Sequence, residues 1–136
     1  MTRPLPFQFD DGGRFAAGYR GRTGDCVTRA LAIATGEDYA RVYAELFAAA
    51  GRTPRNGVSR KVYQPWLEAR GWVWMPTMQV RQGCTVHLRR RELPTGRLVC
   101  RLSKHLCAVI DGTTHDTSDP GRGGGRCVYG YFRLPD

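Results

Sequence analysis

The sequence predicts a single α+β domain in which helices pack on an antiparallel sheet. The chain has 136 residues, a length that suits one domain with one core. Helical patterns occupy its first half, at about residues 26–70, and strand patterns its second half, at about 97–134. Helices and strands segregated along the chain in this way are typical of α+β proteins.

Residues 1–22 differ from the rest of the chain in composition. They are rich in Pro, Gly and Arg, and three phenylalanines lie among them, at Phe7, Phe9 and Phe15. This composition indicates an extended N-terminal arm that packs through its aromatic rings. The arm is followed by one domain over residues 23–136.

Three helices are expected between residues 26 and 70. In the first, over 26–35, apolar residues recur at positions 27, 30, 31 and 34, which is the spacing of one buried helical face. The second covers 39–50, where Asp38 can cap the N-terminus and a glycine follows the last residue. The third runs over about 58–70 and contains Pro65, which can kink or divide it.

The segment after the helices mixes several signals. Residues 72–78 are expected to form a short strand, and residues 85–93 a short helix that carries three consecutive arginines at 89–91. This basic cluster could contact phosphates, but a solvated basic turn is the simpler interpretation. A Pro-Thr-Gly turn at 94–96 then ends the segment.

Four strands are expected from residue 97 onward. Residues 97–103 alternate apolar and polar side chains, the pattern of a half-buried strand, and 105–110 are densely apolar. The dipeptide Asp111-Gly112 is a strong hairpin signal that returns the chain as a strand over 113–117. A last strand, rich in aromatic residues, is expected over 127–134.

The charge of the chain allows several kinds of partner. The net charge is +9, from 21 basic and 12 acidic residues, and all the basic residues except Lys61 and Lys104 are arginines. Such a charge suits an acidic peptide, a nucleic acid or another phosphate-bearing partner, although an Arg-rich composition can equally reflect a GC-rich genome. A Gly-rich run at 121–126 could wrap a phosphate, but it lacks the P-loop pattern, and we favour a flexible loop.

Hydropathy and cysteine content predict a reduced, cytoplasmic protein. No apolar run is long enough for a membrane span or a signal peptide, so we expect no membrane contact. The five cysteines are odd in number and show no CxxC spacing, which argues against a disulfide framework and against a zinc finger. No metal or organic cofactor is implied. Four of the cysteines are expected to be small buried hydrophobic residues, namely Cys84, Cys100, Cys107 and Cys127.

Cys26 differs from the other cysteines because it begins a predicted helix. A helix N-terminus carries partial positive charge and free N–H groups, which favour the thiolate and lower the pKa of a cysteine. The same N–H groups can receive an oxyanion that develops on a substrate carbonyl. Asp25 opposes thiolate formation unless it caps the helix or pairs with an arginine. Cys26 is therefore a candidate nucleophile.

His105 is the best candidate for the base among the three histidines. It begins a predicted strand, from which its ring can reach a helix N-terminus, and the hairpin that follows brings Asp116 near it. A carboxylate in that place would fix the imidazole tautomer and stabilise the imidazolium. His115 is expected on the opposite face of its strand from Asp116, because strand side chains alternate. His87 falls in the basic turn and is expected at the surface.

The segment GDCVTRALAIATG, followed far downstream by KHLCAVIDGTTHDT, resembles the papain-like cysteine peptidases, in particular the compact single-domain members of bacteria and phages. The resemblance covers about residues 24–134. It implies a central helix opened by the nucleophile and packed on an antiparallel sheet. By position it assigns Cys26 as nucleophile, His105 as general base and acid, and Asp116 as the residue that orients the base.

The family usually places a glutamine several residues before the nucleophile, where it completes the oxyanion hole. Residues 19–23 of this chain contain no glutamine, and the nearest one upstream is Gln8, which could fold back along the arm. Thr23, Arg22 or backbone N–H groups could serve instead. Asp25 is the remaining candidate for contact with the oxyanion or the substrate.

The resemblance implies a cysteine hydrolase that cleaves an amide bond through a thioester at Cys26. The bond would lie in a peptide, an isopeptide or a cell-wall crosslink, and deamidation or transamidation would use the same residues. The alternative is a catalytically inactive papain-like module whose basic surface binds nucleic acid or an acidic protein. The enzyme needs an accessible Cys26 thiol close to His105, whereas the binding module tolerates Cys26→Ala.

Overall fold

The computed structural model describes residues 3–21, 24–79 and 81–135, and these form one α+β unit, as the sequence predicts. Within these ranges lie three α-helices and six strands. The α-helices are α1 (Cys26–Thr35), α2 (Tyr39–Ala50) and α3 (Arg60–Glu68). The strands are β1 (Phe7–Phe9), β2 (Val73–Pro76), β3 (Arg97–Leu102), β4 (His105–Ile110), β5 (Thr113–Asp116) and β6 (Gly130–Arg133). Short 3-10 helices are η1 (Pro54–Asn56) and η2 (Arg122–Gly124).

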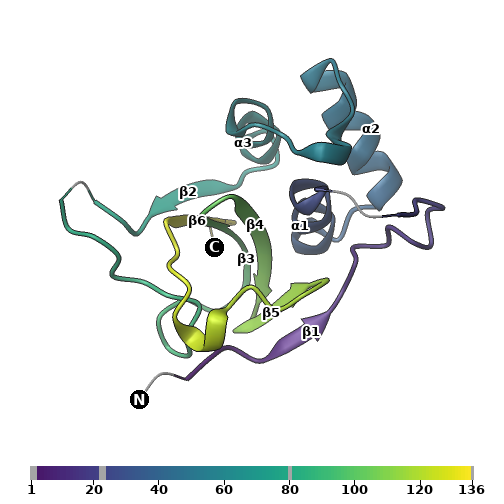
Figure 1. Ribbon diagram of the computed structural model, residues 1–136. Coiled ribbons are helices and arrows are strands. Elements are labelled where there is room, and N and C mark those ends of the chain that lie inside the picture. Colours follow the sequence, from purple (N-terminus) through teal and green to yellow (C-terminus); the bar gives the residue numbers. More distant parts are fainter. Residues whose placement is uncertain (1–2, 22–23, 80, 136) are drawn as a thin grey trace.

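The strands form one mixed sheet in the order β1-β5-β4-β3-β6-β2. All pairings are antiparallel except that of β1, which runs parallel to β5. The three helices lie on one side of the sheet, and α1 lies directly beside β4 (Figure 1). Among the described residues, no helix is long and apolar enough to cross a membrane.

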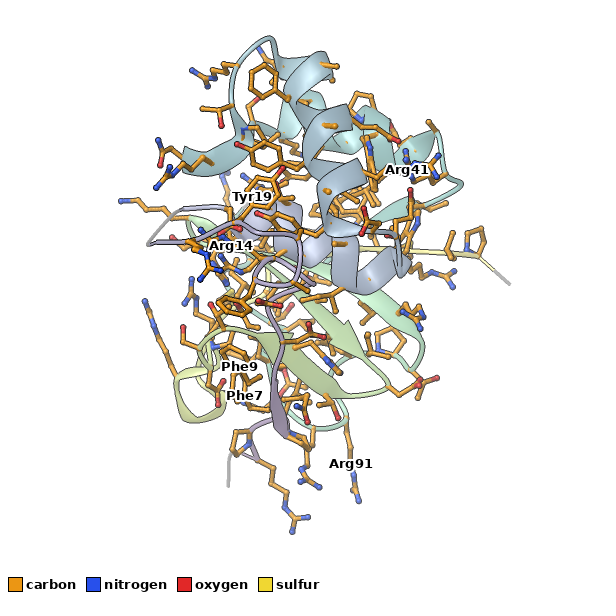
Figure 2. All side chains as sticks on the ribbon, turned by 90° about the vertical axis from the view of Figure 1, so that its right-hand side faces the viewer. Phe7, Phe9, Arg14, Tyr19, Arg41 and Arg91 are labelled. Atoms are coloured by element: carbon orange, nitrogen blue, oxygen red, sulfur yellow. A yellow bond between two sulfur atoms is a disulfide. The ribbon has the colours of Figure 1, made fainter. Side chains whose placement is uncertain are left out.

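The N-terminal arm is part of this sheet, and the expectation that it packs through its aromatic rings holds for Tyr19, which packs against the core, but is wrong for the three phenylalanines. Phe7, Phe9 and Phe15 are 38%, 62% and 65% exposed, and the first two belong to β1 (Figure 2). The backbone also holds the arm: the Asp10 N–H donates to the Asp116 carbonyl at 2.9 Å. The sheet is therefore not wholly antiparallel, because a segment from the other end of the chain adds a parallel edge strand.

The expected helices form where the local signals are strongest. The Asp38 carboxylate accepts a hydrogen bond from the Arg41 N–H at 3.2 Å, which caps α2 as predicted. The third helix is shorter than expected at both ends, and Pro65 lies inside it. The hairpin between β4 and β5 turns at Asp111 and Gly112, whose φ angles of 49° and 78° are those of the tight turn that this dipeptide favours.

The sheet is covered on both faces, so the half-buried pattern expected for residues 97–103 is wrong. In β3 the consecutive residues Leu98, Val99 and Cys100 are all buried. Val99 packs in the core beneath the helices, and its two neighbours pack in a second core on the opposite face. This second core is closed by the loops that carry Leu88 and Val128, a long-range arrangement that periodicity within one strand does not reveal.

Residues 85–93 do not form the predicted helix. Their backbone pairs with the chain before β6 instead: the Leu88 N–H donates to Arg126 at 2.9 Å, and the Val128 N–H donates to Val86 at 2.8 Å. Leu88 is only 1% exposed, since it fills the second core. Tertiary packing and long-range hydrogen bonds thus outweigh the weak helical preference of this segment.

A disulfide joins Cys84 to Cys127, which corrects the expectation that both are buried thiols. The odd cysteine count requires only one unpaired thiol, and the fold brings these two Cα atoms to 6.0 Å, a normal separation for a disulfide. Cys100 and Cys107 are buried free thiols, as predicted. Disulfides are typical of oxidising compartments, so the cytoplasmic expectation loses the support that the cysteine count gave it.

Candidate active site

Three of the residues singled out in the sequence meet where α1 packs on β4. Cys26 is the first residue of α1, His105 the first of β4, and Asp116 the last of β5. The contact between α1 and β4 brings the thiol to the imidazole, and the hairpin brings the carboxylate to the same ring. Cys26 therefore meets two residues that follow it in the chain by about 80 and 90 positions.

The ring of His105 is held by a buried carboxylate. Its Nε2 lies 2.6 Å from Oδ2 of Asp116, whose side chain is only 5% exposed. Burial by itself would raise the pKa of Asp116, but the hydrogen bond and the charge of His105 outweigh it and lower that pKa. In the same way burial would lower the pKa of His105, but Asp116 and Cys26 raise it to about 9. The ring is thus biased toward the imidazolium.

Cys26 faces the same ring. Because Nε2 of His105 is used by Asp116, Nδ1 remains for the thiol. Burial would raise the pKa of Cys26, but hydrogen bonding to His105 and to the Leu106 N–H, together with the charges of His105 and Arg29, lowers it. A lowered thiol pKa beside a raised imidazole pKa favours the thiolate–imidazolium pair, which is the reactive form of a nucleophilic cysteine.

Arg29 is a member of the cluster that the sequence analysis missed. Its guanidinium pairs with Asp25 and, at 3.4 Å, with Asp116, so it holds the carboxylate that orients His105. The residue is 9% exposed and lies one helical turn after Cys26. Its position four residues after Asp25 could have indicated that the two side chains pair, because side chains four apart in a helix are neighbours.

Asp25, a candidate for contact with the oxyanion or the substrate, is used elsewhere. It is 2% exposed, accepts a hydrogen bond from the Tyr39 hydroxyl at 2.6 Å, and pairs with Arg29 and Arg14. Arg14 comes from the N-terminal arm, beside Tyr19 (Figure 2). Burial and Asp25 together raise the pKa of Tyr39. Of the two expectations for Asp25, a helix cap or an arginine partner, the second is therefore correct. The arginines offset its negative charge, so Asp25 opposes formation of the Cys26 thiolate less.

Gln8, another candidate for the oxyanion hole, lies away from the cluster. Gln8 is exposed, and its side-chain amide donates to the neighbouring Phe9 carbonyl at 3.1 Å. It is aligned with His115, so it points to the opposite face of the sheet from Asp116. Thr23 and Arg22, the other side chains expected to serve the oxyanion hole, lie outside the described residues.

A cavity of about 600 Å³ opens at Cys26 and His105. Its other walls come from the loop before α3, from α3 itself, and from the ends of β3 and β6. Asn56 supplies the one carboxamide among the described lining residues, and its backbone abuts Gly24, two residues before the nucleophile. Nothing in the sequence around Asn56 predicted this position, which depends on how η1 packs against the start of α1.

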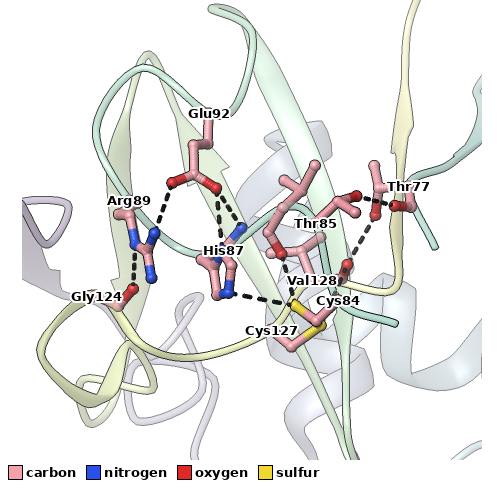
Figure 3. The surroundings of a disulfide bond; sticks show 10 residues. Thr77, Cys84, Thr85, His87, Arg89, Glu92, Gly124, Cys127 and Val128 are labelled. Atoms are coloured by element: carbon pink, nitrogen blue, oxygen red, sulfur yellow. Dashed lines mark hydrogen bonds and ion pairs between the residues drawn. A yellow bond between two sulfur atoms is a disulfide. The ribbon is translucent and has the colours of Figure 1, made fainter. Parts of the chain in front are cut away.

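The two remaining histidines lie away from this cavity. His115 contacts Asp10 at 3.5 Å and points away from Asp116, as alternation predicts. His87 is not on a helical surface turn, which corrects the prediction: its Nε2 lies 3.5 Å from Sγ of the disulfide-bonded Cys84, and its Nδ1 lies 3.1 Å from Glu92 (Figure 3).

The basic and glycine-rich segments are structural in the described residues. Arg89 donates to the Gly124 carbonyl at 2.8 Å and pairs with Glu92 at 3.2 Å, which ties the loop of residues 85–93 to the glycine-rich loop (Figure 3). Arg90 donates to the Pro4 carbonyl at 3.4 Å. Among the described residues, no group of three His, Cys, Asp or Glu side chains could hold a metal ion.

Comparisons with known protein families, with curated proteins and with solved structures find no match for this chain.

Proposed function

We propose that this protein is a papain-like cysteine hydrolase that cleaves an amide bond, in a peptide or an isopeptide, through a thioester on Cys26. The observation that carries the proposal is that Cys26 and His105 line the same cavity, where Asp116 holds the His105 ring at 2.6 Å and His105 lowers the pKa of the Cys26 thiol. The order of nucleophile, base and carboxylate along the chain, at the start of a helix and on the two strands of a hairpin, supports the proposal.

The proposed reaction uses Cys26 as the thiolate and His105 as the imidazolium, the forms that the directions of their pKa shifts favour. The Cys26 thiolate attacks the amide carbonyl and forms a C–S bond, and the carbonyl oxygen takes up the negative charge. The imidazolium of His105 then gives its proton to the amine nitrogen, the C–N bond breaks and the amine leaves. Neutral His105 next removes a proton from water, which attacks the thioester. The C–S bond breaks, the carboxylic acid leaves, and the thiolate–imidazolium pair is restored.

The oxyanion is received at the start of α1. The N–H groups of the first helical turn have no partner within the helix and point toward the nucleophile end, where the helix dipole also favours negative charge. The carboxamide of Asn56 takes the place of the glutamine that the family places before the nucleophile, because Asn56 lines the cavity beside Gly24. The loss of one such donor typically lowers kcat by about 100-fold or more.

The proposal is tested by the pH dependence of iodoacetamide alkylation. Cys26 is the one free cysteine that is not buried, since Cys100 and Cys107 are buried and the other two are disulfide-bonded. We expect the wild type to be alkylated at Cys26 alone, with a midpoint below the ordinary pKa of a thiol. In His105→Ala the midpoint returns to about pH 8.5, the value of a free cysteine.

His87→Ala is the matched control, because His87 also lies against a cysteine sulfur but outside the cavity. It leaves the Cys26 profile unchanged, and His105→Gln serves as a second variant should the alanine variant fold poorly. An ordinary thiol profile for wild-type Cys26 would contradict the hydrolase proposal. It would favour the alternative of an inactive module that binds partners through its basic surface.

A further inference from the structure

The cavity beside Cys26 is lined by cations. Apart from His105, the charged side chains among its described lining residues are Arg29, Arg60, Arg101 and Lys104, and none of the described lining residues is acidic. Arg29 is neutralised by its two carboxylate partners. The charge that a bound molecule meets therefore comes mainly from the other three.

Arg60 is held in place without being neutralised. It begins α3, and its guanidinium lies 4.2 Å from the centre of the Trp74 ring, a cation–π contact. Its Nε donates to the Gln64 side chain at 2.7 Å. Trp74 is itself fixed by a close approach to Gly130, where a Cβ atom would lie 2.3 Å from the ring. These contacts fix the position of the guanidinium and leave its positive charge in the cavity.

Arg101 lines the same cavity as Arg60. It lies near the end of β3, aligned with Leu106, the neighbour of His105. Its guanidinium lies 5.9 Å from the centre of the Tyr129 ring. Tyr63 connects the two arginines with the nucleophile: burial raises the pKa of its hydroxyl, the charges of Arg101 and Arg60 oppose this, and the charge of Cys26 adds to it.

The absence of carboxylate partners distinguishes these two arginines from several others in the chain. Among the described residues, neither Arg60 nor Arg101 forms an ion pair with a carboxylate. Other arginines are paired with Asp or Glu, namely Arg14, Arg29, Arg41, Arg70 and Arg89. Two guanidinium groups without a carboxylate partner form a site for a planar anion such as a carboxylate.

We propose that the substrate is an acidic peptide and that Arg60 and Arg101 bind a carboxylate-bearing side chain next to the scissile bond. This inference rests on the proposed hydrolase function and names its substrate class. An acidic peptide is favoured over a nucleic acid because the two arginines without a carboxylate partner line a cavity of about 600 Å³ at the nucleophile. The exposed cluster around Arg89, in contrast, is partly neutralised by Glu92.

The charge of the cavity is tested by comparing alkylation of Cys26 by iodoacetate, an anion, with alkylation by iodoacetamide, its neutral analogue. In both reactions the thiolate displaces iodide, so the fraction of thiolate cancels in the ratio of the two rate constants. We expect Arg60→Gln and Arg101→Gln each to lower the ratio of iodoacetate to iodoacetamide rates by about twofold, and the double variant by about fivefold.

Two controls separate charge from folding. The charge-retaining double variant Arg60→Lys and Arg101→Lys should keep the ratio within about twofold of wild type. Arg41→Gln, on the exposed side of α2 with its side chain 69% exposed, should leave the ratio unchanged. An unchanged ratio in the Arg60→Gln and Arg101→Gln double variant would overturn the inference.

The substrate class is tested by protection of Cys26 from iodoacetamide with two acetylated dipeptide amides. Ac-Glu-Glu-NH₂ should slow alkylation of the wild type, and Ac-Gln-Gln-NH₂ should not. Equal protection by both peptides, or stronger protection by an oligothymidylate, would overturn the assignment of an acidic peptide. The two proposals can fail independently. An ordinary pH profile of Cys26 alkylation would contradict the hydrolase proposal. The ratio of iodoacetate to iodoacetamide rates reports the charge of the cavity whether or not the protein is a hydrolase.

Discussion

Two regions of this protein bring a cysteine, a histidine and a carboxylate into contact, and they differ in almost every property that matters for catalysis. The first, the Cys26 site, consists of Cys26, His105 and Asp116. The second, the Cys84 site, consists of Cys84, His87 and Glu92. The Cys26 site is assembled from three elements that are distant in the chain, and the Cys84 site from a single loop (Figure 3).

The two sites differ in the state of the sulfur, in the burial of the carboxylate and in their surroundings. Cys26 is a free thiol at a cavity, whereas Cys84 is bonded to Cys127 and has no thiolate to offer. The carboxylate of Asp116 is 5% exposed and that of Glu92 is 25% exposed, so solvent screens the second contact more. Of the two sites, the Cys26 site therefore combines the features that the proposed chemistry needs, namely a free sulfur, a buried carboxylate and room for a substrate.

The largest expected effect is on stability at the Cys84 site. The double variant Cys84→Ser and Cys127→Ser removes a crosslink between residues 43 positions apart. It should lower the free energy of unfolding by about 3 kcal/mol, measured by urea denaturation under oxidising conditions. Alkylation of Cys26 in the folded protein should stay at the wild-type rate, and a large loss of that rate would show that the two sites are coupled.

Asp116→Asn should act on reactivity at the Cys26 site. The amide keeps the shape of the carboxylate but loses the charge that raises the pKa of His105. Alkylation of Cys26 at about pH 6.5 should slow by about tenfold, since one unit of thiol pKa is a tenfold change in thiolate below that pKa. Glu92→Gln is the matched variant at the Cys84 site and should leave the rate unchanged. If Asp116→Asn and Glu92→Gln slowed alkylation of Cys26 equally, the distinction between the Cys26 site and the Cys84 site would be refuted.

The pair of His105 and Asp116 should also appear in the pH dependence of stability. In the Cys26→Ser variant no thiol titrates at the site, so His105 can be followed by itself. Its folded pKa is raised above the unfolded value near 6.5 and is about 9 with Cys26 present. The stabilisation is thus complete below about pH 6.5 and is lost as pH rises through the folded pKa; each unit by which Asp116 raises that pKa corresponds to about 1.4 kcal/mol, reduced by solvent screening of the partly exposed ring. Adding His105→Gln should flatten this profile between those pH values.

The smallest expected effect is that of His87→Ala. His87 contacts an exposed disulfide and a partly exposed Glu92, so its loss should lower the free energy of unfolding by less than about 1 kcal/mol. Circular dichroism during thermal unfolding measures this change. A destabilisation as large as that of the disulfide variant would mean that His87, and not the crosslink, holds the loop of residues 85–93.

The sequence predicted some elements of the fold and most residues of the Cys26 site, but it did not predict all of them. The strong local signals, such as the capped helix α2 and the Asp111-Gly112 hairpin, gave elements close to those observed. The positions of Cys26 at a helix start and of His105 and Asp116 on one hairpin followed from the same signals. Helical periodicity predicts the apolar residues of α1 that face the core but not a buried ion pair, so it did not indicate Arg29.

The sequence by itself determined the class of the domain, the helix that begins at Cys26 and the hairpin that joins His105 to Asp116, because caps, periodicity and turn residues act within a few positions of the chain. The tertiary structure alone decided the disulfide, the conformation of residues 85–93, the parallel strand of the N-terminal arm and the arginines that face the cavity. Each of these depends on contacts between residues distant in the chain. Their energies come from burial and pairing across the molecule, and no local pattern records them.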